Sequence, residues 1–111
     1  MKRSYINKES KKRRAEKDRW FALEHDLREM GDNKSELSGW LPSWENDYYV
    51  EYHHIRGRSG KRIYDPFNVI ALTSEEHRDI EEERNKTSKE ELEDIVRSIR
   101  ISQGFKENDE R

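Results

Sequence analysis

The sequence predicts a small α+β domain, in which two short strands and a following helix pack with an N-terminal and a C-terminal helix. Only 30% of its 111 residues are apolar and 43% are charged, so its core must be small. Apolar residues recur at three- and four-residue steps near both ends of the chain. The middle is rich in Tyr, Val and Ile between glycine-containing turns. We therefore expect one domain over residues 1–111.

The first helix is predicted over residues 10–30, within a basic N-terminal segment of residues 1–31. Its apolar stripe consists of Trp20, Leu23, Leu27 and Met30. Gly31 follows at a position that commonly ends a helix. Residues 2–19 include nine Lys or Arg and three acidic residues, a charge that attracts phosphate. A solvated helix face has the same charge pattern.

The middle segment, residues 48–84, is predicted to be a ββα unit. Residues 31–47 have loop composition, and three apolar side chains in them are expected to anchor the loop on the core: Trp40, Leu41 and Trp44. Strands are predicted over residues 48–55 and 67–72, joined by a glycine-containing turn region. Thr73 or Ser74 is the expected N-cap of a helix that runs to about residue 84.

The last helix is predicted over residues 88–103, with Ser88 and Glu91 as a capping box. Its apolar face consists of Leu92, Ile95, Val96 and Ile99. We expect this face to pack directly against Trp20, Leu23 and Leu27 of the first helix. Residues 104–111 are expected to form a loose acidic tail.

Several classes of protein are excluded by composition. The absence of cysteine excludes disulfides, thiolate zinc sites and cysteine nucleophiles. No apolar run approaches the ~20 residues that span a bilayer, and the residues after Met1 are polar and basic, unlike a signal peptide. These features predict a cytoplasmic protein without a membrane partner.

Three of the four histidines lie in the predicted ββα unit, which suggests a functional site. His53 and His54 end the first strand, and His77 lies near the start of the next helix. Asn68 begins the second strand, and a basic loop follows the His-His pair. Neighbouring strand residues point to opposite sides, so one metal ion would rarely bind both His53 and His54.

Residues 52–82 contain His-His-Ile, then Gly-Arg, then Pro-x-Asn-Val-Ile-x-Leu, then a helix with His near its start. This order and spacing resemble the HNH endonuclease family, whose fold is the ββα-metal finger. The resemblance implies metal-dependent hydrolysis of DNA phosphodiester bonds with one divalent ion, which could be Mg²⁺, Mn²⁺, Ni²⁺ or Zn²⁺. The small, bare form of the motif suggests a phage or prophage protein.

The resemblance also implies a role for each motif residue. His54 would be the general base, and His53 and His77 would be metal ligands. Glu81, one helical turn after His77, is either a further ligand or a solvated charge. Asn68 would hold the loop that carries the base, a role close to that of an ordinary turn asparagine.

The basic loop is predicted to contact DNA phosphates, chiefly through Arg58, with Lys61 and Arg62 adding charge and Arg56 as a further candidate. DNA is thus the expected partner, and a homodimer or a phage protein partner is left open. Two alternatives remain: a non-catalytic HNH-fold DNA-binding module of a phage, and a small helical interaction protein whose histidines are accidental.

Many HNH proteins carry a second, structural zinc on two Cys-x-x-Cys pairs. The corresponding positions in this sequence are Ser35, Ser38, Thr73 and Glu76. Hydroxyl groups are poor zinc ligands, so we expect no structural zinc. Apolar packing of the flanking helices is expected to replace it.

Overall fold

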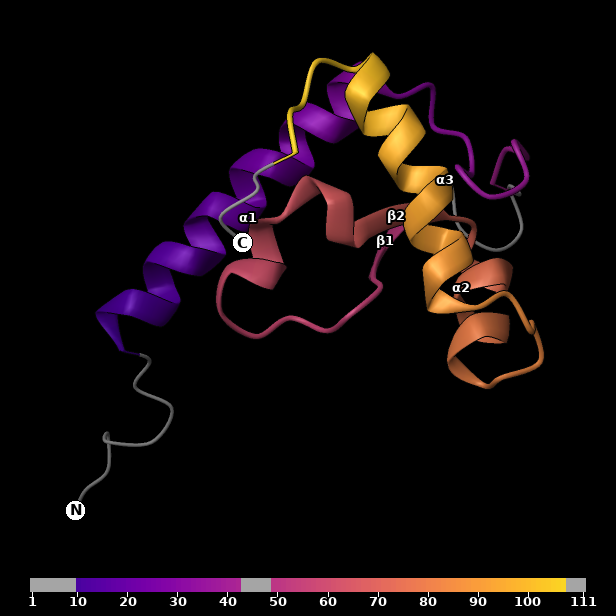
Figure 1. Cartoon of the computed structure of the whole chain (residues 1–111), viewed down its shortest axis with the longest axis horizontal. Coiled ribbons are helices and arrows are strands. Elements are labelled where there is room, and N and C mark those ends of the chain that lie inside the picture. Colours follow the sequence, from indigo (N-terminus) through magenta and orange to yellow (C-terminus); the bar gives the residue numbers. More distant parts are fainter. Residues whose placement is uncertain (1–9, 43–48, 108–111) are drawn as a thin grey trace.

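The computed structural model describes residues 10–42 and 49–107 and shows a small α+β domain (Figure 1). Its helices and strands follow in the order α1 (Lys11–Met30), β1 (Glu51–His54), β2 (Val69–Leu72), α2 (Ser74–Glu81) and α3 (Lys89–Ser102). The strands are antiparallel, and their register runs from Glu51 opposite Leu72 to His54 opposite Val69. Among the described helices, none has both the length and the apolar character needed to cross a membrane.

The helix α1 covers one face of the two-stranded sheet. It begins at Ser10, whose hydroxyl accepts a hydrogen bond from the backbone N–H of Arg13 at 3.0 Å, and it ends at Gly31. Its buried stripe packs in one cluster: Trp20, Leu23, Leu27, Ile63 and Val69. The predicted helix ends and the buried positions of Trp20, Leu23 and Leu27 are therefore confirmed. The predicted place of Met30 in this stripe is wrong, because Met30 is the last residue of the helix and is 43% exposed.

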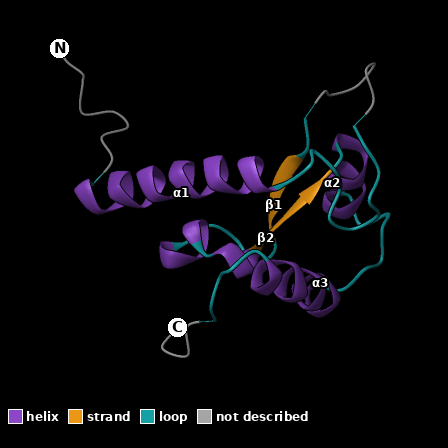
Figure 2. Ribbon diagram, turned by 90° about the horizontal axis from the view of Figure 1, so that it is seen from above, coloured by secondary structure: helices purple, strands orange, loops and turns teal. Residues whose placement is uncertain are grey.

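The helix α3 packs on the other side of the sheet (Figure 2). A separate cluster contains Ile55, Ile70, Leu72, Leu92 and Val96. The expectation that the stripes of α1 and α3 pack directly together is wrong. All four residues of β2 are buried and they alternate between the two faces, so each helix stripe has its own cluster.

Both strands and α2 are shorter than predicted. A 3₁₀ turn over Pro66–Asn68 precedes β2, because the Asp65 carboxylate accepts the N–H of Phe67 at 2.9 Å. The capping box of Thr73 and Glu76 starts α2 as predicted. This helix ends at Glu81, not near residue 84, and Glu83 follows with a left-handed φ of 60°.

The predicted anchoring of the 31–47 loop is wrong for two of its three side chains. Trp40 is 70% exposed and Leu41 is 64% exposed, and Trp44 lies outside the described residues. Polar contacts hold this loop instead. Ser35 Oγ accepts the N–H groups of Leu37 and Ser38, both at 3.1 Å, and Glu36 pairs with the buried Arg100 of α3.

The chain after α3 does not begin as a loose tail. Phe105 packs against the α1 cluster, and its N–H donates to the backbone oxygen of Arg100 at 3.0 Å. Glu107 forms an ion pair with Arg97. Phe105 and Glu107 of the predicted tail thus contact the domain, and residues 108–111 lie outside the described part.

Candidate metal centre

The pleat of β1 sends its two histidines to opposite faces of the sheet. His53 faces α2, where its ring centroid lies 5.2 Å from that of His77. His54 faces α1, where its ring lies 4.6 Å from Trp20 in an edge-to-face contact. The strand alternation expected from the sequence therefore separates one candidate ligand from the candidate base.

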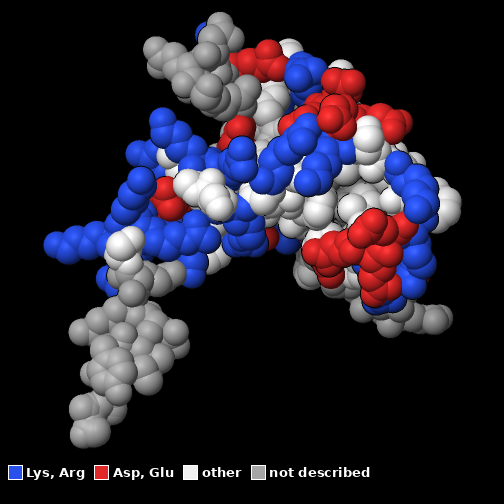
Figure 3. Space-filling model, turned by 60° about the horizontal axis from the view of Figure 1, so that its bottom comes forward, with Lys and Arg blue, Asp and Glu red and all other residues white. Residues whose placement is uncertain are grey.

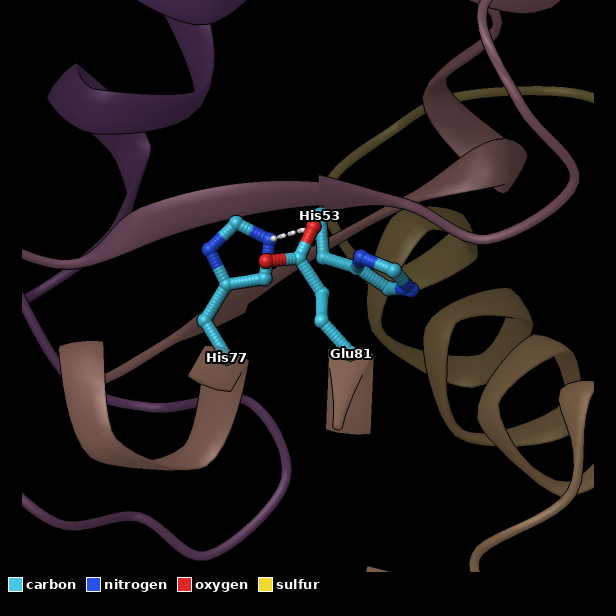
Figure 4. A group of neighbouring side chains, drawn as sticks. All are labelled: His53, His77 and Glu81. Atoms are coloured by element: carbon cyan, nitrogen blue, oxygen red, sulfur yellow. Dashed lines mark ion pairs between the residues drawn. The ribbon is translucent and has the colours of Figure 1, made fainter. Parts of the chain in front are cut away.

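His53, His77 and Glu81 form a group that could hold a metal ion (Figure 4). Their ligand atoms all lie within 4.8 Å of one another. His77 and Glu81 come from successive turns of α2, and His77 Nε2 lies 3.5 Å from Glu81 Oε2. Ligands bound at about 2.1 Å lie roughly 3–4 Å apart on one ion, so small side-chain rotations would suffice.

Glu51 supports this group, and the sequence reasoning missed it. His77 Nδ1 lies 2.7 Å from Glu51 Oε1, and Ser74 Oγ donates to Glu51 Oε2 at 3.1 Å. A carboxylate that accepts the Nδ1–H of a histidine leaves Nε2 with the lone pair that binds metal. Glu51 lies two residues before His53 on β1, so the alternation of strand residues puts both side chains on the same face of the sheet. This two-residue spacing is the sequence feature that could have identified Glu51 as part of the site.

His54 is held in a nearly closed environment. Its side chain is buried, and its Nε2 lies 3.0 Å from the backbone oxygen of Ile63, to which it can donate. Nδ1 then keeps the free lone pair. Burial lowers the pKa of His54 below 6.5, and burial followed by the His77 charge lowers the pKa of His53 likewise. Both imidazoles are therefore mainly neutral near pH 7.

Asn68 ties the loop after β1 to the start of β2. Its Nδ2 donates to the backbone oxygens of Gly57 and Arg62, both at 2.9 Å. Its Oδ1 accepts the N–H of Arg56 at 2.8 Å. Gly57 has a φ of 93°, a conformation that glycine adopts without strain. These bonds use both ends of the buried amide and fix the loop beside His54.

The four basic residues of this loop do not share one environment. The guanidinium of Arg56 is held by Glu93 of α3, with Nε and Nη2 at 3.1 and 2.9 Å from the two carboxylate oxygens. Arg58, Lys61 and Arg62 are exposed. The loop is joined to α1 by Arg13, whose Nη1 donates to the backbone oxygen of Arg58 at 3.1 Å.

Exposed cations of the loop thus adjoin the basic first half of α1. Figure 3 shows Lys and Arg side chains gathered at the end of the molecule where α1 begins. Residues 11–19 include six Lys or Arg and two acidic residues, one of which, Glu16, is buried beside Arg13. We call this the α1–loop basic surface; it comprises the cations of residues 11–19 with Arg58, Lys61 and Arg62.

An open cleft of about 610 Å³ lies at the end of β1. His53, His54, Gly57 and Glu81 line it, together with residues of the α2–α3 connection. The sequence predicts that His53, His54 and His77 meet at one cleft. The structure places His53 beside His77 on one sheet face, and His54 borders the same cleft as His53 from the other face.

Comparison with known proteins adds no relative to this description. No protein-family model, no curated protein and no solved structure gives a significant match to the chain. The arrangement of its own side chains is therefore what bears on its function.

Proposed function

We propose that this protein is an HNH-type, metal-dependent endonuclease that hydrolyses DNA phosphodiester bonds. The observation that carries the proposal is the convergence of His53, His77 and Glu81 within 4.8 Å, with two of them, His53 and Glu81, lining the cleft that His54 also borders. Two imidazoles and a carboxylate form a donor set that suits a divalent ion. A basic surface beside the cleft suits a polyanionic substrate.

His53, His77 and Glu81 would hold the ion, which would act as a Lewis acid on the scissile phosphate and its leaving oxygen. The protein's own contribution is to present these ligands in the correct state. The contact with Glu51 fixes the Nδ1 proton of His77, so that Nε2 faces the site. The lowered pKa of His53 keeps its imidazole neutral and able to bind metal near pH 7.

His54 would accept the proton of the attacking water at Nδ1. The Ile63 carbonyl orients its ring through Nε2, and the lowered pKa leaves Nδ1 unprotonated near neutral pH. The packing of Trp20 and the loop bonds of Asn68 hold His54 at the rim of the cleft. In this scheme Asn68 acts as a positioning residue.

The α1–loop basic surface would bind the phosphate backbone of the DNA. Arg58 follows Gly57, which lines the cleft, and its side chain is exposed. Contacts to phosphate carry no sequence information directly, so Arg58→Ala should weaken binding about equally across sequences. Arg56 would instead brace the loop against α3 through Glu93.

The test is incubation of the purified protein with plasmid DNA and each of Mg²⁺, Mn²⁺, Ni²⁺ and Zn²⁺, with EDTA as the metal-free control. His54→Ala should abolish cleavage and leave metal binding largely intact, whereas His77→Ala should weaken metal binding itself. His25→Ala is the matched control, because His25 lies on α1 with its side chain 71% exposed. Equal loss of metal affinity in the His54 and His77 variants would show that the roles are wrongly assigned, and an inactive wild type would refute the proposal.

A second candidate function is a DNA-binding module without catalysis. The observation that favours it is the burial of His54, which is only 8% exposed and has Trp20 against its ring. Such a module would bind the same DNA through the α1–loop basic surface and cleave it with none of the four metals.

A further inference from the structure

Two lysines between the end of α2 and the start of α3 border the candidate site: Lys86 lies in the α2–α3 connection, and Lys89 is the first residue of α3. Lys86 and Lys89 line the cleft that His53 and Glu81 also line, and both are exposed. Neither forms a hydrogen bond or an ion pair with any residue in the described part of the chain. By contrast, Arg84 on the same connection is paired with Asp79 at 3.0 Å and Glu82 at 2.8 Å.

The carboxylates nearest to Lys89 along the chain are directed elsewhere. Glu90 lies 3.5 Å from Arg56, and Glu93 holds the same guanidinium. Glu91 accepts the N–H of Ser88 in the capping box. Glu83 remains as an acidic residue on the cleft wall, with Glu81 in the metal group. The positive charges of Lys86 and Lys89 are therefore left facing the cleft.

Lys89 borders the same cleft as His53 and Glu81, which are two members of the metal group. Figure 1 shows the loop after β1 running toward α1, while the α2–α3 connection lies beyond α2 on the other side of the strand end. Cations thus lie on both sides of the group formed by His53, His77 and Glu81.

We propose that Lys86 and Lys89 form a second phosphate-binding wall, which holds a DNA backbone phosphate next to the one at the metal group. The ammonium groups act as point charges toward phosphate, the usual role of lysine in such contacts. The DNA strand would then cross the cleft between this wall and Arg58. This inference deepens the proposed endonuclease function and rests on it.

The test compares Lys86→Gln/Lys89→Gln with a control of equal charge change, Lys34→Gln/Lys106→Gln, whose lysines do not line the cleft. Binding to a fluorescent 20-base-pair duplex is measured by anisotropy in EDTA over a range of KCl concentrations. The variant Lys86→Gln/Lys89→Gln, called the wall variant, should make the negative slope of log affinity against log salt concentration shallower by roughly 1.8. It should also weaken DNA binding on the order of tenfold at 0.1 M salt. The control should do neither.

Two further measurements separate the wall from the enzyme. In plasmid cleavage, the wall variant should raise KM and leave kcat near the wild-type value, as expected for an interaction made equally in the ground and transition states. Calorimetry with Ni²⁺ should give unchanged metal affinity, and urea unfolding should show an intact fold. An unchanged KM with a salt slope equal to that of the control would overturn the wall, even if the wild type cleaves DNA. If the wall variant lowers the salt slope but the wild-type protein cleaves no DNA with any of the metals, the result would support the phosphate-binding wall and refute the nuclease function.

Discussion

Replacement of Glu36 by alanine should destabilise this protein by about 3–5 kcal/mol, because it leaves a buried charge without its partner. Arg100 lies on α3 and is 0% exposed. Its Nη1 and Nη2 lie 2.6 and 2.8 Å from the two carboxylate oxygens of Glu36. The pair joins the loop after α1 to α3 across the end of the sheet.

The magnitude follows from the bonds that remain. Without Glu36, the Arg100 guanidinium keeps three neutral acceptors, namely the carbonyls of Pro66 and Val69 and the side chain of Gln103, at 2.9–3.0 Å. The N–H of Ala71 also loses Glu36 Oε1, which accepts it at 2.8 Å, and an unsatisfied buried donor alone costs about 1–3 kcal/mol. Domains of this kind have a total stability of about 5–15 kcal/mol, so the loss is a large fraction of it.

Urea unfolding followed by tryptophan fluorescence measures this loss. The matched control is Arg97→Ala on the same helix, which removes a half-exposed guanidinium paired with Asp94 and Glu107 and should cost less than about 1 kcal/mol. The double variant Glu36→Leu/Arg100→Met should recover much of the stability that Glu36→Ala loses. If Glu36→Ala costs no more than Arg97→Ala, the buried pair does not stabilise the domain as argued.

Three further predictions concern backbone strain, pH and metal. Glu83→Gly should raise the free energy of unfolding by about 0.5–1 kcal/mol, because Glu83 has a left-handed φ of 60°, which glycine adopts without strain. The control Glu82→Gly, at a φ of −92°, should give no such gain. Equal effects of the two substitutions would contradict the assignment of strain to Glu83. The free energy of unfolding should fall as the pH drops below about 6.5, because the folded state lowers the pKa values of His53 and His54 and the unfolded chain therefore binds more protons in this pH range. Urea unfolding midpoints at pH 7.5, 6.5 and 5.5 test this prediction. A midpoint that rises on acidification would contradict it. EDTA should abolish cleavage at only a modest cost in stability, with metal analysis giving at most one tightly bound ion per chain; two zinc ions or global unfolding would refute this.

Local hydrogen bonds made much of the secondary structure predictable. Ser10, Thr73 and Ser88 each accept the N–H three residues ahead, so polar spacing along the chain marks the start of each helix. The alternation of β1 likewise separates His53 from His54, and the helical spacing of His77 and Glu81 puts them on one face. Each of these relations involves residues at most a few positions apart.

Only the tertiary structure decided which distant groups meet. Glu51 supports His77 across 26 positions, Glu93 holds Arg56 across 37, and Glu36 pairs with Arg100 across 64. With 43% of its residues charged, the sequence offers many alternative partners for every cation. The prediction that Trp40 anchors its loop on the core is wrong because polar contacts of Ser35 and Glu36 hold this loop, and composition does not reveal such contacts. Spacing along the chain determines which residues share a helix turn or a strand face, whereas the packing of separate elements determines which charges are neutralised and which face solvent.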